Sequence, residues 1–345
     1  MPTLPKSKLI LVALAVVALA ALPATASATL SYTKGFRHAR VYYANDNGKG
    51  AHEIGRGGNP HVSPNGELIV YEGEPKRETA PMRLYSTATG KTETLLPKWR
   101  EGFVFAWSPD STMVAAMRGG GLNSPGSLVV VDVETGRQIK VATGYVSGVS
   151  FAPESDELVY GISKTLSVQL KSNVYRYSIA SGRSVALSHD HNASYPLWGP
   201  TGQIAFVRQL GAKRRKYGPK LELYQMNEEG QRISRLTKTK VSPLSLGLIP
   251  LAWSESGSRL LAEFTGEDQS YAVAVNAVTG AQKALTDNPQ MGLIGGGISA
   301  DGKTVLGTTG LGFGPSPHPK VVTVPFKGGK EKVLVKGAYE PSWGG

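Results

Sequence analysis

The 345-residue sequence contains no cysteine. This absence excludes a disulfide framework, a zinc site built from thiolates and a lipid anchor attached to a cysteine. A domain without disulfides or structural thiolate sites must be stabilised by its apolar core, and a chain of this length can bury a large one.

The sequence also lacks a long apolar run. The longest one covers 14 residues, from 9 to 22. A bilayer-spanning helix needs about 20. Lys6 and Lys8 precede the run, and small residues at Ala26 and Ala28 follow it. This arrangement is typical of a secretory signal peptide. We therefore predict that residues 1–28 are removed and that 29–345 form a secreted or periplasmic protein without a transmembrane anchor.

Acidic residues are the minority charge, with 26 Asp and Glu against 38 Lys and Arg. Removal of Lys6 and Lys8 leaves a net charge near +10. For an exported chain, this excess favours an envelope protein or an anionic cell-surface polymer as the partner. Nucleic acid is not an expected partner, because export separates the chain from most of it. Solubility is the alternative interpretation of the charge.

A short motif with an apolar residue before a Ser-, Pro- or Gly-containing turn occurs seven times. Its apolar residue recurs at intervals of 44 to 55 residues, from Val62 to Trp343. An alternating apolar run follows six of the copies, and this alternation predicts a β-strand. A second apolar run then ends in a glycine turn, as in "VVVDVETGR", which predicts a hairpin. Four strands in a unit of about 45 residues are typical of a propeller blade. The copies are 60–66, 105–111, 150–155, 196–202, 251–257, 297–302 and 339–345.

The repeats predict an all-β, seven-bladed β-propeller with four-stranded antiparallel blades, in one domain over 29–345. Six blades are the alternative. The segments 30–35, 39–46 and 51–55 correspond to the second, third and fourth strands of a unit that lacks its first. Residues 339–343 have the pattern of that missing strand. We therefore expect one blade to be closed by both termini, which removes the open sheet edges at the seam.

The segments "FAWSPDS…DVETGRQIKVA", "LAWSESG…AVTGAQKALT" and "YEPSWGG" resemble the TolB-type, WD-like repeat of exported bacterial propellers. The resemblance extends over essentially all of 29–345 and implies the propeller fold. TolB itself has an N-terminal α/β domain and six blades, which this sequence does not reproduce. The hydrolase domain of prolyl oligopeptidase-type enzymes is also missing. The resemblance therefore implies an architecture and not TolB's role in an envelope complex.

No recognisable catalytic motif is present, so we predict a non-enzymatic protein that needs no cofactor. The hydrolase pentapeptide G-x-S-x-G does not occur, and Ser147 in "GYVSGVS" has the wrong glycine spacing. The predicted channel-lining strands contain one acidic residue, Glu340, whereas a glycosidase needs at least two converging carboxylates. His189, Asp190 and His191 are weak metal-ligand candidates on a loop, and a solvated loop tip is the alternative.

Loop lengths differ between the two ends of the predicted blades. The turns from first to second and from third to fourth strands are short, and we call their side the short-turn face. The other two kinds of connection emerge on the opposite side, the long-loop face, and include 73–82, 118–127, 209–220, 307–319, 97–102, 188–194, 238–250 and 287–297. Rigid scaffolds tend to bind through elaborated loops. We therefore expect the long-loop face to bind the partner.

The densest positive cluster on that face is Lys213, Arg214, Arg215 and Lys216, beside Tyr217. Arg118, Lys164 and Lys240 are expected to extend it. Trp99 and Tyr195 are candidate aromatic anchors, and packing against the next blade is their alternative role.

We thus predict a monomeric, exported binding module for an envelope protein or an anionic polymer. One alternative is a lyase or hydrolase that uses His189, Asp190 and His191 in the channel mouth. The other is a propeller that binds a small molecule or a sugar there.

Overall fold

The computed structural model describes residues 28–75, 79–99, 104–120, 124–165, 171–211, 218–266, 269–287, 292–312 and 317–344. Within these ranges the regular secondary structure consists of β-strands, β1 to β26. In the same ranges, no helix has the length and apolar character needed to cross a membrane. The predicted signal peptide lies outside the described residues, apart from Ala28.

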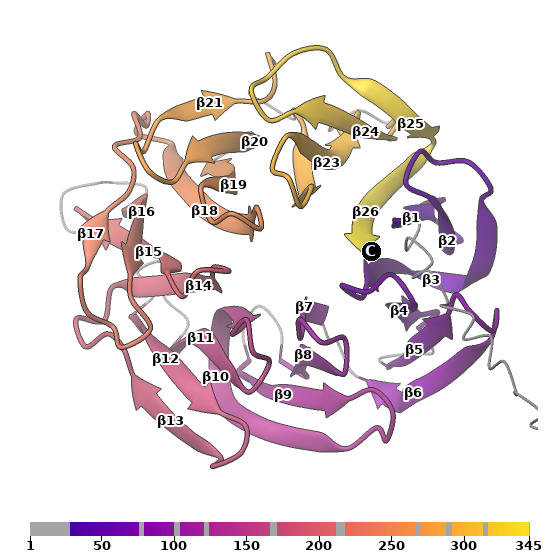
Figure 1. The fold of residues 1–345 in the computed structure, drawn as a ribbon, viewed down its shortest axis with the longest axis horizontal. Coiled ribbons are helices and arrows are strands. Elements are labelled where there is room, and N and C mark those ends of the chain that lie inside the picture. Colours follow the sequence, from indigo (N-terminus) through magenta and orange to yellow (C-terminus); the bar gives the residue numbers. More distant parts are fainter. Residues whose placement is uncertain are drawn as a thin grey trace, which may run out of the picture.

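The strands pair into four-stranded antiparallel blades arranged around a ring (Figure 1). The first blade contains β26 (Ala338–Gly344), β1 (Thr29–Lys34), β2 (Arg40–Asn45) and the beginning of β3 (His52–Val62). The second contains the rest of β3, β4 (Leu68–Gly73), β5 (Ala80–Ser86) and β6 (Thr92–Trp99). The third contains β7 (Val104–Trp107), β8 (Met113–Arg118), β9 (Gly126–Asp132) and the beginning of β10 (Gln138–Phe151).

The remaining blades follow in chain order. The fourth contains the rest of β10, β11 (Glu157–Ser163), β12 (Ser172–Ser178) and β13 (Arg183–Ala186). The fifth contains β14 (Ala193–Trp198), β15 (Ile204–Leu210), β16 (Lys220–Met226) and β17 (Ser234–Arg235). The sixth contains β18 (Ser245–Trp253), β19 (Arg259–Gly266), β20 (Gln269–Asn276) and β21 (Gln282–Ala284). The seventh contains β22 (Ile294–Ile298), β23 (Thr304–Thr309), β24 (Lys320–Pro325) and β25 (Lys332–Lys336). The all-β propeller prediction is confirmed, and this grouping fits seven blades.

The two ends of the described chain close the ring. Strand β26 pairs antiparallel with β1, with Trp343 opposite Leu30 and Ser342 opposite Ser31. Figure 1 shows β26 in yellow beside β1 in indigo. The prediction that one blade is built from both ends is therefore confirmed, and neither of these strands has a free edge at the seam.

Some blade-to-blade connections are shorter than predicted. Strands β3 and β10 each run from the outermost position of one blade into the innermost position of the next. Likewise, β14 begins at Ala193 and β18 at Ser245, inside segments that were expected to be loops. The polar and glycine-rich composition of these segments suggested loops, but backbone pairing with the neighbouring strand continues through them.

The repeated motif holds neighbouring blades together. The indole N–H of Trp107 donates to the carbonyl of His61 at 3.0 Å, and that of Trp253 donates to the carbonyl of Leu197 at 3.2 Å. Each bond links the innermost strands of adjacent blades. Apolar clusters fill the spaces between blades, for example between the fifth and sixth around Leu248. In these two copies, the tryptophan of the motif thus contributes to the packing of adjacent blades.

Candidate functional site

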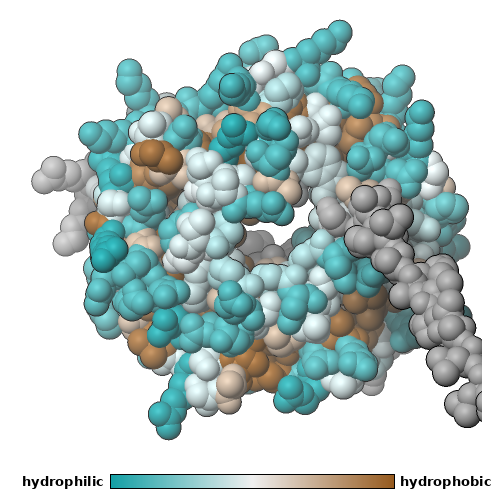
Figure 2. Space-filling model, viewed as in Figure 1, coloured by the Kyte–Doolittle hydropathy of each residue, from teal (hydrophilic) through white to brown (hydrophobic). Residues whose placement is uncertain are grey.

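The innermost strands of the blades are β26, β3, β7, β10, β14, β18 and β22. Figures 1 and 2 show that the ring of blades leaves a central opening. In each of these innermost strands, at least one extra residue is inserted relative to the second strand of its blade, and β18 contains two such insertions. Such bulges redirect side chains and are frequent near functional sites. We call this set the bulge ring; its register shifts fall within 58–61, 104–106, 146–148, 194–197, 250–252, 295–297 and 339–342.

Three members of the bulge ring contain a non-glycine residue in the left-handed conformation directly before a proline. They are Asn59 with φ 52°, Tyr195 with φ 50° and Glu340 with φ 53°. A residue before proline normally prefers extended backbone, and such strained conformations cost about 1–3 kcal/mol each. They persist only where the surrounding structure holds them in place.

Asn59 and Glu340 meet where the first and second blades adjoin. Glu340 Oε2 accepts hydrogen bonds from the backbone N–H of Asn59 and from Thr33 Oγ1, both at 2.9 Å. The Glu340 residue is otherwise exposed. A fixed, exposed carboxylate at the channel can therefore accept further hydrogen bonds or attract a cationic group.

A second carboxyl group, Glu72, interacts electrostatically with Glu340. Burial, and to a lesser extent the charge of Glu340, raises the pKa of Glu72 to about 7. Its Oε1 atom is buried without a hydrogen-bond partner among the described residues. Sequence analysis identified Glu340 and missed Glu72, because Glu72 lies on the second strand of its blade. The alternating pattern of β4 does not reveal its interaction with Glu340, which lies on a strand of another blade.

A pocket of about 270 Å³ opens beside this pair. His61 contributes to its wall, with Nε2 3.1 Å from Asn59 Oδ1. Burial lowers the pKa of His61 to about 4, so its imidazole is neutral at pH 7. The wall also includes residues of the seventh blade, namely Ile294, Gly295, Gly296, Thr308 and Leu311. The pocket thus presents a carboxylate, an amide and a neutral imidazole beside small and apolar groups.

Tyr195 lies in strand β14 and not on a loop. Its backbone N–H donates to Ser147 Oγ at 3.1 Å, and its side chain packs against the apolar cluster between the fifth and sixth blades. Burial raises the pKa of the Tyr195 phenol. Packing within the ring, the alternative role expected for this aromatic, agrees with these contacts. Ser147 lies at the register shift of β10, and its hydroxyl oxygen accepts this hydrogen bond from the backbone of Tyr195.

Two of the three weak metal candidates, Asp190 and His191, have other contacts. Asp190 Oδ2 pairs with Arg208 Nη2 at 2.5 Å, and His191 Nδ1 lies 3.0 Å from Asn173 Nδ2. The Arg208 guanidinium lies over the Tyr224 ring, 5.2 Å from its centre. Across the described ranges, no three His, Asp or Glu side chains are grouped so that they could hold a metal ion.

The predicted basic cluster Lys213, Arg214, Arg215 and Lys216, with Tyr217, lies outside the described residues. Arg118 is described and exposed at the end of β8, with Nη1 3.3 Å from Gln138 Oε1. The backbone of Trp99 ends β6 opposite Ala80. Its side chain is outside the described part of the structure.

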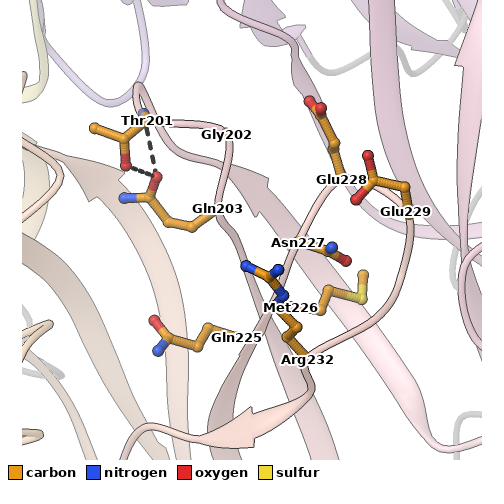
Figure 3. Close-up of a pocket in the computed structure, with 9 residues that line it drawn as sticks. All are labelled: Thr201, Gly202, Gln203, Gln225, Met226, Asn227, Glu228, Glu229 and Arg232. Carbon is orange, nitrogen blue, oxygen red and sulfur yellow. Dashed lines mark hydrogen bonds between the residues drawn. The ribbon is translucent and has the colours of Figure 1, made fainter.

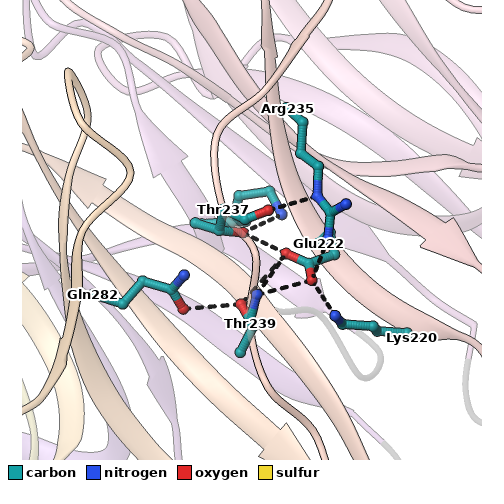
Figure 4. A network of polar contacts seen from close by, with 7 residues as sticks. Lys220, Glu222, Arg235, Thr237, Thr239 and Gln282 are labelled. Carbon is teal, nitrogen blue, oxygen red and sulfur yellow. Dashed lines mark hydrogen bonds and ion pairs between the residues drawn. The ribbon is translucent and has the colours of Figure 1, made fainter.

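A polar network adjoins the chain segment that leads to the basic cluster (Figure 4). The side chain of Glu222 is 0% exposed and pairs with Lys220 Nζ at 2.5 Å and with Arg235 Nη2 at 2.9 Å. Thr237 Oγ1 donates to it at 2.7 Å, and the Thr239 N–H at 2.9 Å. Burial raises the pKa of Glu222, but bonds from Lys220, Thr237 and Thr239 outweigh it, so the pKa is lowered overall.

The short-turn face has its own pocket, of about 450 Å³, in the fifth blade (Figure 3). Amide and charged side chains line it, including Gln203, Gln225, Glu228 and Arg232. The backbone N–H of Thr201 donates to Gln203 Oε1 at 3.1 Å. Because hairpin turns form its walls, sequence periodicity gave no signal for this pocket.

No protein-family model matches the chain, and no curated protein matches its sequence. Its structure is similar to that of TolB from Acinetobacter baumannii, with a TM-score of 0.56 and 12% identity over 92% of this chain and 82% of that one. An oligogalacturonate lyase in complex with manganese matches with a TM-score of 0.57 and 16% identity, over 80% of this chain and 76% of the lyase. A puromycin-hydrolyzing peptidase of Mycobacterium tuberculosis matches with a TM-score of 0.62 and 17% identity, over 89% of this chain and 53% of the peptidase.

These similarities show that the chain has a TolB-like β-propeller fold, which confirms the resemblance seen in its repeats. The similar structures include a lyase and a peptidase as well as TolB. Because one fold supports many activities, the function has to be argued from the site.

Proposed function

We propose that this protein is an exported, non-enzymatic binding module whose partner docks on the long-loop face, over the channel mouth. The observation that carries the proposal is the contrast between the two ends of the blades. One end consists of short hairpin turns. The other carries the longest connections between described strands, after β15, β17, β21 and β23, together with the strained residues Asn59 and Glu340. Binding groups are commonly placed on such elaborated loops of a rigid scaffold.

The charge of the long-loop face supports a partner with acidic groups. Arg118, Lys164 and Lys240 are exposed on connections of this face or on strand ends beside them. The excess of 38 basic over 26 acidic residues in the whole sequence strengthens attraction to anionic partners. The expected partner is an envelope protein with an acidic surface or an anionic cell-surface polymer.

The test compares capture from an envelope extract by residues 29–345 and by a triple variant, R118E/K164E/K240E. Protein and polymer fractions are both identified, at low and at high salt. We expect a specific ligand that the triple variant and high salt release, because charge reversal removes the long-range attraction.

The matched control reverses the same number of charges on the short-turn face, in the variant K91E/R137E/K330E. All three of these side chains are exposed. The control should keep the ligand. If both variants lost the ligand equally, binding would depend only on the total charge of the protein. That result would refute a defined binding face.

A second candidate function is binding of a small molecule in the channel mouth, which the pocket of about 270 Å³ beside Glu340 favours. Filling that pocket with S342W tests it in a screen of small sugars and amines against the wild type. Ligand binding that S342W abolishes, in a variant that still captures the envelope partner, would separate the two functions.

A further inference from the structure

A pocket of about 310 Å³ lies between the sixth and seventh blades, near the short-turn face and away from the channel mouth. The sixth blade contributes Arg259 from β19, Ala274 and Asn276 from β20, and Lys283 from β21. The seventh blade contributes the turn after β24, with Phe326 and Lys327. Residues of two adjacent blades thus form the walls of the pocket.

Contacts from the sixth blade hold the seventh-blade turn on two sides. The Arg259 guanidinium lies over the Phe326 ring, with its central carbon 5.6 Å from the ring centre. Lys283 lies against Gly328, so closely that a Cβ atom on that glycine would be 2.8 Å from the Lys283 ammonium nitrogen. Lys327 stands between Phe326 and Gly328 in the chain. Three cationic side chains therefore come together at one turn.

Among the described residues, no acidic side chain lines this pocket. In the described part of the chain, Arg259, Lys283 and Lys327 form no ion pair, and the nearby Asp301 carboxylate pairs with Lys303. Arg259 Nη1 instead donates to the backbone carbonyl of Asp301 at 3.3 Å, which fixes the side chain without neutralising it. The three positive charges thus have no ion-pair partner among the described carboxylates.

We propose that this pocket is a binding site for a phosphate-type oxyanion. Such a group offers several oxygens and up to two negative charges, so one group can accept hydrogen bonds from a guanidinium and two ammonium groups together. The Asn276 amide also lines the site, although its oxygen already accepts from the N–H groups of Val278 and Thr279. The volume is at the lower end for ligand pockets, which suits a small phosphate ester or a single lipid headgroup.

This site is independent of the proposed function, because it lies near the short-turn face and shares no residue with the channel mouth. The site also differs from the overall positive charge of the surface, since its three cationic side chains come from two blades and lie at one turn. Charge-neutralising changes in this pocket should leave capture of the envelope partner intact.

The experiment measures binding of inorganic phosphate to residues 29–345 by isothermal titration calorimetry, with chloride at equal ionic strength as the reference. The pocket variant is K283Q/K327Q. The matched control is K330Q/K332Q, which removes two exposed lysines of the seventh blade that lie outside the pocket. We expect the pocket variant to bind phosphate about tenfold more weakly and the control to change less than about twofold. The melting temperature of each variant verifies folding.

A parallel measurement uses phosphatidylcholine vesicles with and without phosphatidylglycerol. Vesicle binding that depends on phosphatidylglycerol and is lost in K283Q/K327Q would assign the oxyanion to a lipid headgroup, even with weak free phosphate binding. Binding of phosphate alone would assign it to a soluble ester. The proposal is overturned if neither probe binds beyond its reference, or if K330Q/K332Q loses as much binding as the pocket variant.

Discussion

The pKa values of two carboxyl groups in this propeller, those of Glu72 and Glu222, shift in opposite directions. Burial raises the pKa of both, because it disfavours the charged form. Around Glu222, Lys220, Thr237 and Thr239 stabilise the carboxylate and lower its pKa overall. Glu72 instead faces the negative charge of Glu340, and its pKa rises to about 7. The neighbouring side chains therefore decide the charge of each group.

The raised pKa of Glu72 predicts a pH dependence of folding. Between pH 4.5 and about 7, the folded state keeps a proton on Glu72 that the unfolded state has lost. Stability contributed by this group is therefore lost as the pH rises through that window. The variant E72Q should remove this slope and be more stable relative to wild type at pH 8 than at pH 5, by at most about 3 kcal/mol.

Urea unfolding of both proteins at pH 5 and pH 8 measures the effect. The control is E74Q, since Glu74 is close in sequence but its side chain is 54% exposed. Its change should stay within about 0.5 kcal/mol at either pH. A stability difference between wild type and E72Q that does not vary with pH would contradict the assignment.

Glu222 should matter for stability because its removal leaves its donors without their acceptor. We expect E222A to lower the free energy of unfolding by about 2–4 kcal/mol. Urea unfolding at pH 7 checks this, with E229A as the control, because Glu229 is an exposed residue of a hairpin turn. A loss of less than 1 kcal/mol in E222A would mean that water replaces the network.

At the scale of elements, the continuous strand β3 depends on a glycine at its bend. Gly57 has φ +136°, and a Cβ atom there would lie 1.8 Å from the carbonyl oxygen of Glu72. Strand β4 pairs with β3 at this point, since Gly57 lies opposite Gly73. A side chain at position 57 would therefore separate the two strands on which Asn59 and Glu72 lie.

The variant G57A should lower the free energy of unfolding by about 3 kcal/mol or more, because it combines backbone strain with a clash. The control G90A also substitutes a glycine with positive φ, +68°, but has no atom within 4 Å of the added Cβ. We expect it to cost about 1 kcal/mol. Equal effects in thermal unfolding would show that conformation alone, and not the close approach to Glu72, determines the cost.

The whole molecule depends on the pairing of β26 with β1. Deleting residues 338–345 removes a strand from the first blade and exposes the edge of β1. We expect the truncated protein to melt at least about 10 °C lower and to form aggregates, because an open edge pairs with other chains. Size-exclusion chromatography with light scattering and calorimetry would measure both effects.

The control for the truncation is W343A, which keeps the backbone pairing and removes one side chain of the closing strand. It should remain the same size in solution as wild type and lose about 2–4 kcal/mol of stability, as large-to-small changes in a core do. A truncated protein as stable as W343A would show that ring closure contributes little beyond this side chain.

The sequence by itself determined the architecture, because architecture depends on local patterns that repeat. Strand alternation and the spacing from Val62 to Trp343 imply equivalent blades, and a ring of blades needs the strand at 339–343 to complete the first one. The same reasoning placed Glu340 on a channel-lining strand. These features follow from short segments whose pattern of apolar and turn residues recurs in each blade.

Only the tertiary structure decided which side chains meet. Three examples involve residues on different strands or different blades. They are the electrostatic interaction of Glu72 with Glu340, the ion pairs that surround the buried Glu222, and the close approach of Lys283 to Gly328. A bulge shifts a strand by one residue and so changes what faces the channel, yet alternating patterns do not show where it occurs. Architecture is set by repeated local signals, whereas a site is set by contacts between segments that differ from one blade to the next.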